Sequence, residues 1–508
     1  MGKYGIFDII GPIMIGPSSS HTAGAVRIGL MAGQLTKYDP IAVKLQFHGS
    51  LAKDYHAHCT DTGVLAGIMG FQVDDDRIRT AFEIAEEKGI AVKCEPVDIA
   101  GAHPSTIVVI QKSRNGTSST VRSKTIGGGN IVVEAINGYP VEMTGDRHEI
   151  FFMGSHSDKV PSIIGSKWKW IIGEDKIYTQ YRTDAVSTEE IKKAIHSLSQ
   201  LGFVAYLKPI VDEKGFGLEF FDQIDDLIQK AIRSRKSVGR IVIEYEVKNT
   251  GQDEEWVRLK MQRCLDVMRE AGYLGTSQAQ KTLGGLGGGD ALRLDRARAA
   301  GRTISGSTLV RAAALALGAA EVNAAMGRVV ACPTAGSCGI LGAVVAATAE
   351  NKDLSDSKVV EALFAAAGVG LIIAENSTIS GSTGGCQAEC GVASAMAAAA
   401  LVELEGGTPK QLAHGIAIAL KNIIGLVCDP VAGFVEVPCI KRNAGAVANA
   451  FIAADMALSG IRSVIPPDEV VAALKDAGQL MDPKLKATLG GGLSATATAK
   501  KIEKNLLF

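Results

Sequence analysis

The alanine-rich second half of the chain constrains the fold more than any other feature. Residues 301–460 hold 37 alanines among 160 residues, and their only aromatic residues are Phe364, Phe434 and Phe451. Helices so poor in bulky side chains must pack at close range or lie buried on every side. The stretch GVASAMAAAALVEL (391–404) is apolar all round, which is typical of a central helix in an all-α domain.

Length and composition indicate several globular domains. A chain of 508 residues is too long for one ordinary domain, and 46% hydrophobic with 21% charged residues is typical of globular proteins. The chain has 53 Lys+Arg and 54 Asp+Glu residues, which leaves a formal charge of -1. This charge balance does not favour nucleic acid or an anionic membrane as a partner. Small molecules are the expected partners.

No membrane or targeting segment is expected. The start MGKYGIFDIIG lacks a charged region followed by a long apolar run, so we expect a cytoplasmic protein. The longest stretch without charge, Val329 to Ala349, contains Pro333, Thr334 and Ser337, which predicts a loop followed by a buried helix.

The pattern along the chain predicts a multidomain α+β protein with three parts. Residues 1–147 mix glycine-rich loops with alternating segments such as IAVKLQFHG and STIVVIQ, which predicts an α/β domain. Residues 148–215 read as βαββαβ, the order of a ferredoxin-like unit. Residues 216–508 are helical and predict an all-α domain. Because the Ala/Gly helices offer more apolar surface than one face can close, we expect a homo-oligomer, with a dimer as the simplest form.

Three of the nine cysteines lie in loops bounded by Gly or Pro: Cys386 in STGGCQAECG, Cys428 in GLVCDPVAG and Cys439 in VEVPCIKRN. Their spacing is unlike zinc ribbons or ferredoxins. Three thiolates from such loops could hold three irons of a cubane cluster and leave the fourth open as a Lewis acid. On spacing alone, burial as small hydrophobic residues is the commoner explanation for each of them.

The remaining cysteines are less informative. Cys94 and Cys264 lie in ordinary strand-like and helix-like sequence, so we expect them to serve packing. Cys332 and Cys338 in ACPTAGSCG, and Cys390 four residues after Cys386, stay open between ligand, redox partner and packing.

These segments together resemble the iron-sulfur L-serine dehydratases, which are L-serine ammonia-lyases. GPSSSHTAG (16–24) is similar to a signature of the family's β-chain type, and GCQAECGVASAMAAA, CDPVAGFVEVPCIKRN and NAAMGRVVACPTAG are similar to signatures of its α-chain type. The order of the motifs resembles the fused single-chain form, with the β-type domain first and an ACT-like unit in the middle. The resemblance implies that Cys386, Cys428 and Cys439 ligate a [4Fe-4S] cluster and that the substrate is L-serine.

The sequence departs from the family pattern at several places. A G-H-G-T-D segment of the family is present as AHCTD, which keeps His58, Thr60 and Asp61 but has Cys59 where the family has glycine. The family's H-P-N-T segment is present as HPST, which keeps His103. The ACT-like unit lacks the usual loop sequence, so no effector site is expected in it. Certain relatives end in a cysteine that occupies the fourth iron, whereas this sequence ends in KNLLF.

Dehydration of serine requires a base for the Cα proton and help for the departing hydroxide. Histidine has a suitable pKa, and His21, His58 and His103 all lie in segments that match the family. We expect His58 to be the base because HAHCTD carries hydroxyl and carboxylate groups that could orient its imidazole. The six other histidines, His56 among them, are expected to be structural or solvent-facing.

Substrate-binding residues are expected in loops around these histidines and cysteines. Ser18, Ser19 and Ser20 could form an anion-binding loop, although from the residues alone an N-cap cluster for the helix AGAVRIGLMAG is the better explanation, and both can hold together. The resemblance adds Thr60 and the glycines of TIGGGNI, where a tight turn is the alternative. Those glycines are Gly127, Gly128 and Gly129. The remaining candidates are Asn323 and Thr334, which are polar residues in apolar sequence, and Lys441 and Arg442, which follow Cys439 and have surface exposure as the alternative.

Three other functions stay open from the residues alone. A cysteine desulfidase would use the same chemistry with a thiol as leaving group. An iron-sulfur redox sensor is disfavoured, because it would give the GPSSSHTAG, AHCTD and HPST segments no function. A pyridoxal phosphate dehydratase is disfavoured because no lysine lies in a glycine-bounded loop of the expected kind. The sequence therefore favours an L-serine ammonia-lyase.

Overall fold

The computed structural model divides the chain into two compact units. It describes residues 4–49, 51–154, 170–172, 177–179, 188–200, 202–211 and 218–506. Met1–Ser19 and Lys214–Phe508 form one unit, here called the helical unit, and Ser20–Glu213 form the other, called the sheet unit. The chain therefore passes from one unit to the other within the motif GPSSSHTAG.

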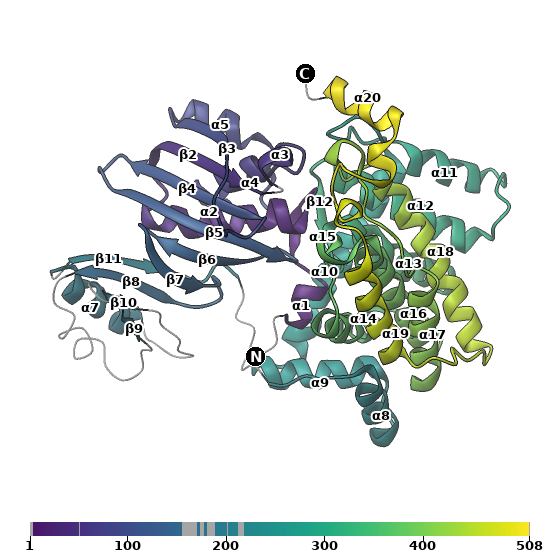
Figure 1. The fold of residues 1–508 in the computed structure, drawn as a ribbon. Helices are drawn as coiled ribbons and strands as arrows, with labels where there is room; N and C mark the ends of the chain where they lie inside the picture. Colours follow the sequence, from purple (N-terminus) through teal and green to yellow (C-terminus); the bar gives the residue numbers. More distant parts are fainter. Residues whose placement is uncertain are drawn as a thin grey trace. The chain divides into compact units, whose positions relative to one another are not determined.

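A six-stranded mixed sheet forms the framework of the sheet unit, in the order β3-β2-β4-β5-β6-β7 (Figure 1). Only the β2–β3 pair is parallel among the paired strands of this sheet. The strands are β2 Pro40–His48, β3 Ala91–Val97, β4 Thr106–Ser113, β5 Ser118–Gly127, β6 Asn130–Ile136 and β7 Tyr139–Met143, and the helices are α2 Gly24–Leu35, α3 Leu51–Asp54, α4 Thr60–Ile68 and α5 Ala81–Glu87.

The alternation predicted for two of these strands is confirmed in one and modified in the other. In β2 the side chains of Val43, Leu45 and Phe47 are buried and their neighbours are less so. In β4 both faces are largely buried. One face, from Ile107 to Ser113, is buried throughout and includes Gln111, whose Nε2 donates to the carbonyl of Ala32 in α2 at 2.5 Å and to Ser119 Oγ at 3.0 Å. On the other face Thr106 and Val108 are buried and Lys112 is exposed.

Glycines bring α2 and α4 close together. A Cβ on Gly67 would lie 2.1 Å from the Val26 carbonyl oxygen, and one on Gly29 would lie 2.2 Å from that of Val64. No side chain fits at either position without moving a backbone. This contact fixes the starts of both helices, where the GPSSSHTAG and HAHCTD segments lie.

The segment predicted to be ferredoxin-like contains two antiparallel strand pairs, β8 Glu149–Gly154 with β11 Gly202–Leu207 and β9 Trp170–Ile172 with β10 Ile177–Thr179. The predicted second helix of the segment is α7 Thr188–Ser199. The first predicted helix lies outside the described residues. The complete βαββαβ unit therefore stays a prediction.

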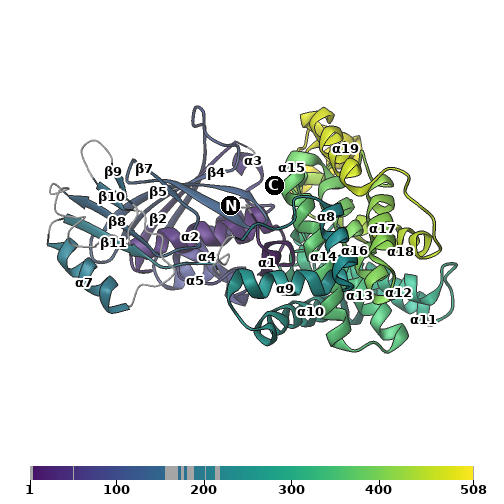
Figure 2. The same cartoon turned by 90° about the horizontal axis from the view of Figure 1, so that it is seen from below.

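The helical unit is built from long helices around one apolar core, seen from a second direction in Figure 2. A short antiparallel pair, β1 Ile13–Ile15 with β12 Arg328–Val330, ties the N-terminal segment to this unit. The helices are α1 Ile6–Ile9, α8 Ile224–Ser234, α9 Val238–Thr250, α10 Glu254–Ser277, α11 Asp290–Ala299, α12 Ser307–Ala324, α13 Cys338–Lys352, α14 Asp356–Asn376, α15 Gly381–Gly384, α16 Val392–Leu404, α17 Pro409–Lys421, α18 Cys439–Leu458, α19 Pro467–Leu480 and α20 Ala497–Leu506.

The expectation of a central alanine helix is confirmed by α16, in which every residue except Glu403 is buried. Close packing through small residues recurs between α10 and α12, where a Cβ on Gly275 would lie 2.3 Å from Gly318 Cα. The stretch from Val329 to Ala349 forms the end of β12, a loop and the buried helix α13, as predicted. Small side chains thus let these helices approach one another closely.

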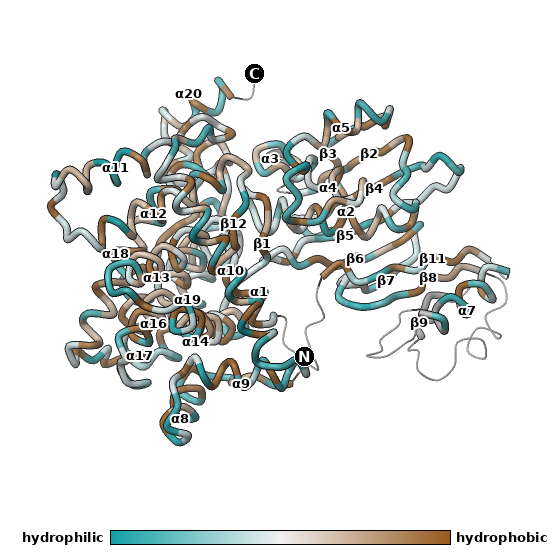
Figure 3. Tube along the Cα trace, turned by 180° about the vertical axis from the view of Figure 1, so that it is seen from behind, coloured by the Kyte–Doolittle hydropathy of each residue, from teal (hydrophilic) through white to brown (hydrophobic). Residues whose placement is uncertain are grey.

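One described helix, α14, is long and apolar enough to cross a membrane by length and composition. Of its most apolar window, 83% is buried inside the protein. The apolar course of this helix can be followed in Figure 3. Core helices of soluble proteins have the same properties, so its burial accounts for its composition.

Candidate functional site

Three separate elements of the helical unit present the predicted cysteine ligands. Cys386 precedes a π-helical turn, Gln387–Gly391, that leads into α16. Cys428 lies in the loop after α17, where its backbone N–H donates to Leu485 and its carbonyl accepts from Ala487. Cys439 is the first residue of α18. As predicted, all three lie at loops or helix ends.

The structure gathers thiols and one carboxylate in a single buried place, here called the thiol centre. Ligand atoms of Cys386, Glu389 and Cys428 all lie within 4.8 Å of one another. The thiols of Cys390 and Cys428 hydrogen-bond to Cys386. The negative charge of Cys386 also acts on Cys439. Thiolates and a carboxylate at one point are a donor set for transition metals or iron-sulfur clusters.

Charge within the thiol centre is concentrated on one cysteine. Hydrogen bonds from Cys390 and Cys428, together with the nearby Arg442 guanidinium, hold the pKa of the Cys386 thiol well below its usual range. Burial, and then the charge of Cys386, raise the pKa of Glu389 to about 8. Space here is tight, because a Cβ on Gly381 would lie 2.5 Å from Glu389 Oε2 and 3.2 Å from Cys428 Sγ.

The two predicted basic residues after Cys439 have different surroundings. Arg442 hydrogen-bonds to Cys386, donates to the Val427 carbonyl at 2.7 Å and pairs with Asp429 at 2.8 Å. It can therefore offset negative charge at the thiol centre. Lys441 is 58% exposed and pairs with Asp290 at 2.8 Å. Neighbouring helix residues point about 100° apart, so only one of the two faces the thiols.

The turn that contains Thr334 lies against the thiol centre. The Thr334 hydroxyl hydrogen-bonds to Glu389. The next residue, Ala335, donates its backbone N–H to Ser19 Oγ at 3.4 Å. Two candidate substrate-binding residues, Thr334 and Ser19, are thus placed around the same centre as the cysteines.

Asn443 joins this turn to the start of α18. It is fully buried, accepts from the Gly339 N–H at 3.1 Å, and donates to the carbonyls of Gly336 at 2.8 Å and Cys439 at 3.0 Å. Both the oxygen and the nitrogen of its side-chain amide are therefore hydrogen-bonded. The side chain fixes the position of Cys439 relative to the Thr334 turn.

Asn323 holds the start of the GPSSSHTAG segment. Its Nδ2 donates to the Pro17 carbonyl at 2.8 Å, and a Cβ on Gly16 would lie 2.3 Å from Asn323 Oδ1. The following residues, Ser19–Ala23, form a π-helical turn before α2, so the N-cap of that helix is Ala23. Ser19 and Ser20 lie in this turn and Ser18 directly precedes it, so the N-cap interpretation of the serines stays a prediction for the helical segment that begins at Ser19.

In the sheet unit, two of the three predicted histidines lie together. The rings of His21 and His58 are 4.7 Å apart between centroids, with an angle of 32° between their planes. Thr22 Oγ1 donates to the His58 carbonyl at 2.7 Å. The close contact of α2 with α4 supports this arrangement, because each histidine lies just before one of those helices.

The carboxylate of the HAHCTD segment, Asp61, pairs with His56. His56 Nδ1 lies 2.5 Å from Asp61 Oδ2, and Asp61 Oδ1 accepts from the Thr62 N–H at 2.8 Å. This bond raises the pKa of His56 above its usual value. His56 is 74% exposed while Asp61 is buried. The expectation that His56 is solvent-facing is confirmed, and the described partner of the Asp61 carboxylate is His56.

The residue that replaces the family's glycine adopts a glycine-like backbone. Cys59 has φ 51° and ψ 37° at the N-cap of α4, in the left-handed region where glycine is favoured. Burial raises the pKa of its thiol to about 12. The next residue, Thr60, is fully buried at the first position of the helix. Cys59 is therefore a packed thiol in a strained turn.

The glycine turn joins β5 to β6, and His103 precedes β4 at the same end of the sheet, because Thr106 of β4 pairs with Lys124 of β5. Gly127, Gly128 and Gly129 all have positive φ, and Arg27 Nη1 of α2 donates to the Gly129 carbonyl at 2.7 Å. The tight-turn interpretation is thus confirmed. His103 Nδ1 accepts from the Ser105 N–H at 3.1 Å, and burial, followed by the charge of Lys124, lowers its pKa.

Cys264, Cys332 and Cys338 are buried in apolar surroundings. Cys264 and Cys332 belong to the main apolar core, and Cys338 Sγ donates to the Ala319 carbonyl at 3.7 Å. Burial raises the pKa of all three thiols. Cys390 joins the thiol centre, and for Cys332 and Cys338 packing stays a prediction, supported by their apolar surroundings.

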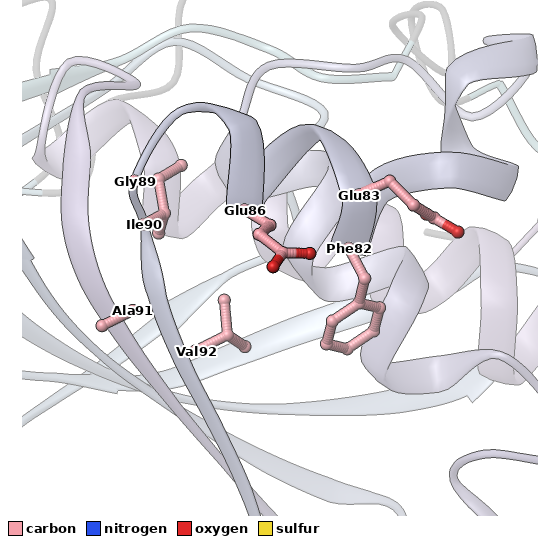
Figure 4. Close-up of a pocket in the computed structure, with 7 residues that line it drawn as sticks. All are labelled: Phe82, Glu83, Glu86, Gly89, Ile90, Ala91 and Val92. Atoms are coloured by element: carbon pink, nitrogen blue, oxygen red, sulfur yellow. The ribbon is translucent and has the colours of Figure 1, made fainter.

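An open pocket of about 600 Å³ lies elsewhere, between α5 and the edge strand β3 (Figure 4). Phe82, Glu83 and Glu86 of α5 line it together with residues 89–92. None of the candidate site residues takes part. The thiol centre and the His21–His58 pair are therefore candidates because of their residue types and contacts, and not because a pocket marks them.

Sequence reasoning missed Glu389 and Asp61's partner His56. Glu389 is a lone carboxylate in the sequence GCQAECG, between two cysteines in apolar surroundings, and that isolation was the available signal. The His56–Asp61 pair has a spacing of five residues that matches neither helix nor strand period, so no pattern indicates it.

Comparison with known proteins finds two family models, one in each part of the chain. The family model described as serine dehydratase alpha chain matches residues 233–494, and that described as serine dehydratase beta chain matches residues 5–115. A chain that carries both matches is a fused two-part protein. This chain belongs to the serine dehydratase family.

Named relatives cover either one part or the whole chain. The probable L-serine dehydratase alpha chain of Bacillus subtilis is 44% identical over 56% of this chain and 95% of the relative. The probable beta chain from the same organism is 40% identical over 32% of this chain and 71% of the relative. The L-serine dehydratase of Streptomyces coelicolor is 30% identical over 96% of this chain and 98% of the relative.

Proposed function

We propose that this protein is an L-serine ammonia-lyase that converts L-serine to pyruvate and ammonia, with a [4Fe-4S] cluster held by Cys386, Cys428 and Cys439. The observation that carries the proposal is the meeting of Cys386 and Cys428 with Glu389 and Arg442 at one buried centre, with Cys439 near enough for the charge of Cys386 to act on it. Relatives along the full length of the chain are named L-serine dehydratases.

The donor set fits such a cluster. Three cysteines come from three different elements, one thiol already has a strongly lowered pKa, and a guanidinium offsets negative charge. Cys390 is a further thiol beside Cys386, and Glu389 adds an oxygen donor. With three cysteine ligands, the bound cluster would supply one open iron as a Lewis acid for the substrate carboxylate and the departing hydroxyl.

The residues of the chain supply binding and proton transfer. We assign removal of the Cα proton to the His21–His58 pair, with His58 as the base and His103 as a further candidate. Ser18, Ser19, Ser20, Thr60, Asn323 and Thr334 supply hydroxyl and amide groups for the substrate, and Gly127, Gly128 and Gly129 a backbone turn.

The overall reaction is an α,β-elimination. Loss of the Cα proton and of the Cβ hydroxide gives aminoacrylate and water. The enamine tautomerises to an imine, and addition of water releases ammonia and leaves pyruvate. The net change is therefore serine to pyruvate plus ammonia, with no external oxidant or reductant. We further propose that the protein works in the cytoplasm as a homodimer, with no nucleic acid or membrane partner.

Anaerobic reconstitution with iron and sulfide tests the proposal. We expect absorbance near 400 nm and pyruvate release from L-serine, both lost together in air. Cys428→Ala should abolish both, whereas the matched control Cys338→Ala should retain them, because Cys338 lies in the apolar packing of α13.

Two results would contradict the assignment. A colourless protein that still releases pyruvate would exclude the cluster mechanism. A coloured protein that is inactive on L-serine but releases sulfide from L-cysteine would identify a desulfidase. In the same series, Cys390→Ala decides whether the fourth thiol of the centre holds iron.

A further inference from the structure

A glycine-rich loop, residues 282–290, is wrapped around a buried carboxylate. Glu436 is 1% exposed. Its Oε1 accepts from the Gly284 N–H at 2.5 Å, and its Oε2 accepts from the Leu286 N–H at 2.8 Å and the Gly287 N–H at 3.1 Å. The Thr282 hydroxyl also lies 2.7 Å from Oε2. Four donors thus converge on one side chain, which is what makes its burial tolerable.

A second carboxylate holds the other end of the same loop. Glu321 of α12 is fully buried and accepts from the N–H groups of Gly289 at 2.9 Å, Asp290 at 2.7 Å and Ala291 at 3.2 Å. These are the first N–H groups of α11, where a negative charge is favourable. The loop is therefore anchored at both ends by carboxylates.

Only one of these carboxylates belongs to the segment that carries a predicted cysteine ligand. Glu436 lies three residues before Cys439, and its own carbonyl accepts from the Ile440 N–H at 3.0 Å, which closes the first turn of α18. Ile440 packs against the loop, where a Cβ on Gly287 would lie 2.7 Å from Ile440 Cδ1. Lys441 pairs with Asp290. The loop thus contacts the chain on both sides of Cys439.

We propose that Glu436 is a positioning residue for Cys439: by binding the 282–290 loop it fixes the backbone from which this ligand reaches the thiol centre. The role as a metal-centre residue rests on the proposed function, whereas the positioning of the Cys439 thiol does not. The described partners of the Glu436 side chain all belong to the 282–290 loop and include no cysteine.

Replacement of Glu436 by glutamine removes the acceptor of one buried backbone N–H group. The amide nitrogen cannot accept a hydrogen bond, so in the best orientation the N–H of Gly284 still loses its acceptor in a buried place. Glu321→Gln is the matched control, because the same argument leaves the N–H of Gly289 without its acceptor while α12 carries no cysteine ligand.

Two measurements test the proposal. In the metal-free protein under anaerobic conditions, the rate at which iodoacetamide alkylates Cys439, relative to Cys386, is read by peptide mass spectrometry. In the reconstituted protein, the rate of iron release to a chelator is followed. We expect Glu436→Gln to raise both rates about tenfold and Glu321→Gln to leave both within about twofold of the parent protein.

Each outcome decides between positioning and general stability. Equal rates in Glu436→Gln and the parent protein would overturn the proposal, because Glu436 would then have no effect on Cys439. Equal increases in the two variants would also overturn it, because loosening of the loop would then act on the whole helical unit. If the parent protein takes up no iron, the proposed function fails, and the alkylation rates still decide whether Glu436 positions Cys439.

Discussion

Asn443 offers the sharpest test of how the thiol centre is assembled. Its side chain makes three hydrogen bonds in a fully buried place, one accepted from Gly339 and two donated to Gly336 and Cys439. Asn443→Ala removes all three, at about 1 kcal/mol each, and leaves the Gly339 N–H buried without an acceptor. We therefore expect a loss of about 3–5 kcal/mol in the free energy of unfolding of the helical unit.

Asn443→Asp separates the two halves of this amide. The new side chain still accepts from Gly339, but an oxygen now faces the two carbonyls to which the nitrogen donated. Repulsion and a buried charge make this variant less stable than Asn443→Ala at neutral pH, although it removes fewer atoms.

The assay is urea unfolding of the metal-free protein followed by circular dichroism at a helical wavelength. Asn449→Ala on the same helix is the control, because Asn449 also makes three hydrogen bonds but is only partly buried, so water can replace them. The reasoning is refuted if Asn443→Ala costs no more than Asn449→Ala, or if Asn443→Asp is the more stable of the two Asn443 variants.

Two further predictions concern other parts of the chain. Gly67→Ala should destabilise the sheet unit by more than about 3 kcal/mol, because its Cβ would meet the Val26 carbonyl, whereas Gly445→Ala, with open space around it, should be neutral or slightly stabilising in thermal unfolding. His56 should titrate above about 6.5 by NMR and return towards that value in Asp61→Asn. Since the folded pKa is raised, the pair stabilises the sheet unit at low pH and this contribution is lost as pH rises through that pKa; an unshifted His56 would contradict the pairing.

Local patterns predicted much of the architecture. The alternation in residues 40–48 predicted β2, and the all-apolar alanine sequence predicted the buried α16, because residue period and side-chain size act over a few neighbouring residues. The cysteine loops were also recognisable, since Gly and Pro mark helix ends. Motifs of the family accounted for His21, His58 and Thr334.

Tertiary structure decided which of these residues meet. The sequence placed residues 1–147 in one domain, whereas contacts place Met1–Ser19 with the helical unit through the β1–β12 pair. From the sequence we expected the HAHCTD carboxylate, Asp61, near His58. The structure shows it paired with His56, across the left-handed turn at Cys59.

The sequence by itself determined the element types, the small side chains that let helices approach closely, and the set of thiols and histidines available for chemistry. Only the tertiary structure decided that Glu389 joins Cys386 and Cys428, and that Glu436 holds the loop beside Cys439. The physical reason is that a buried carboxylate is stable only where donors from distant segments converge, and no local pattern records which segments these are.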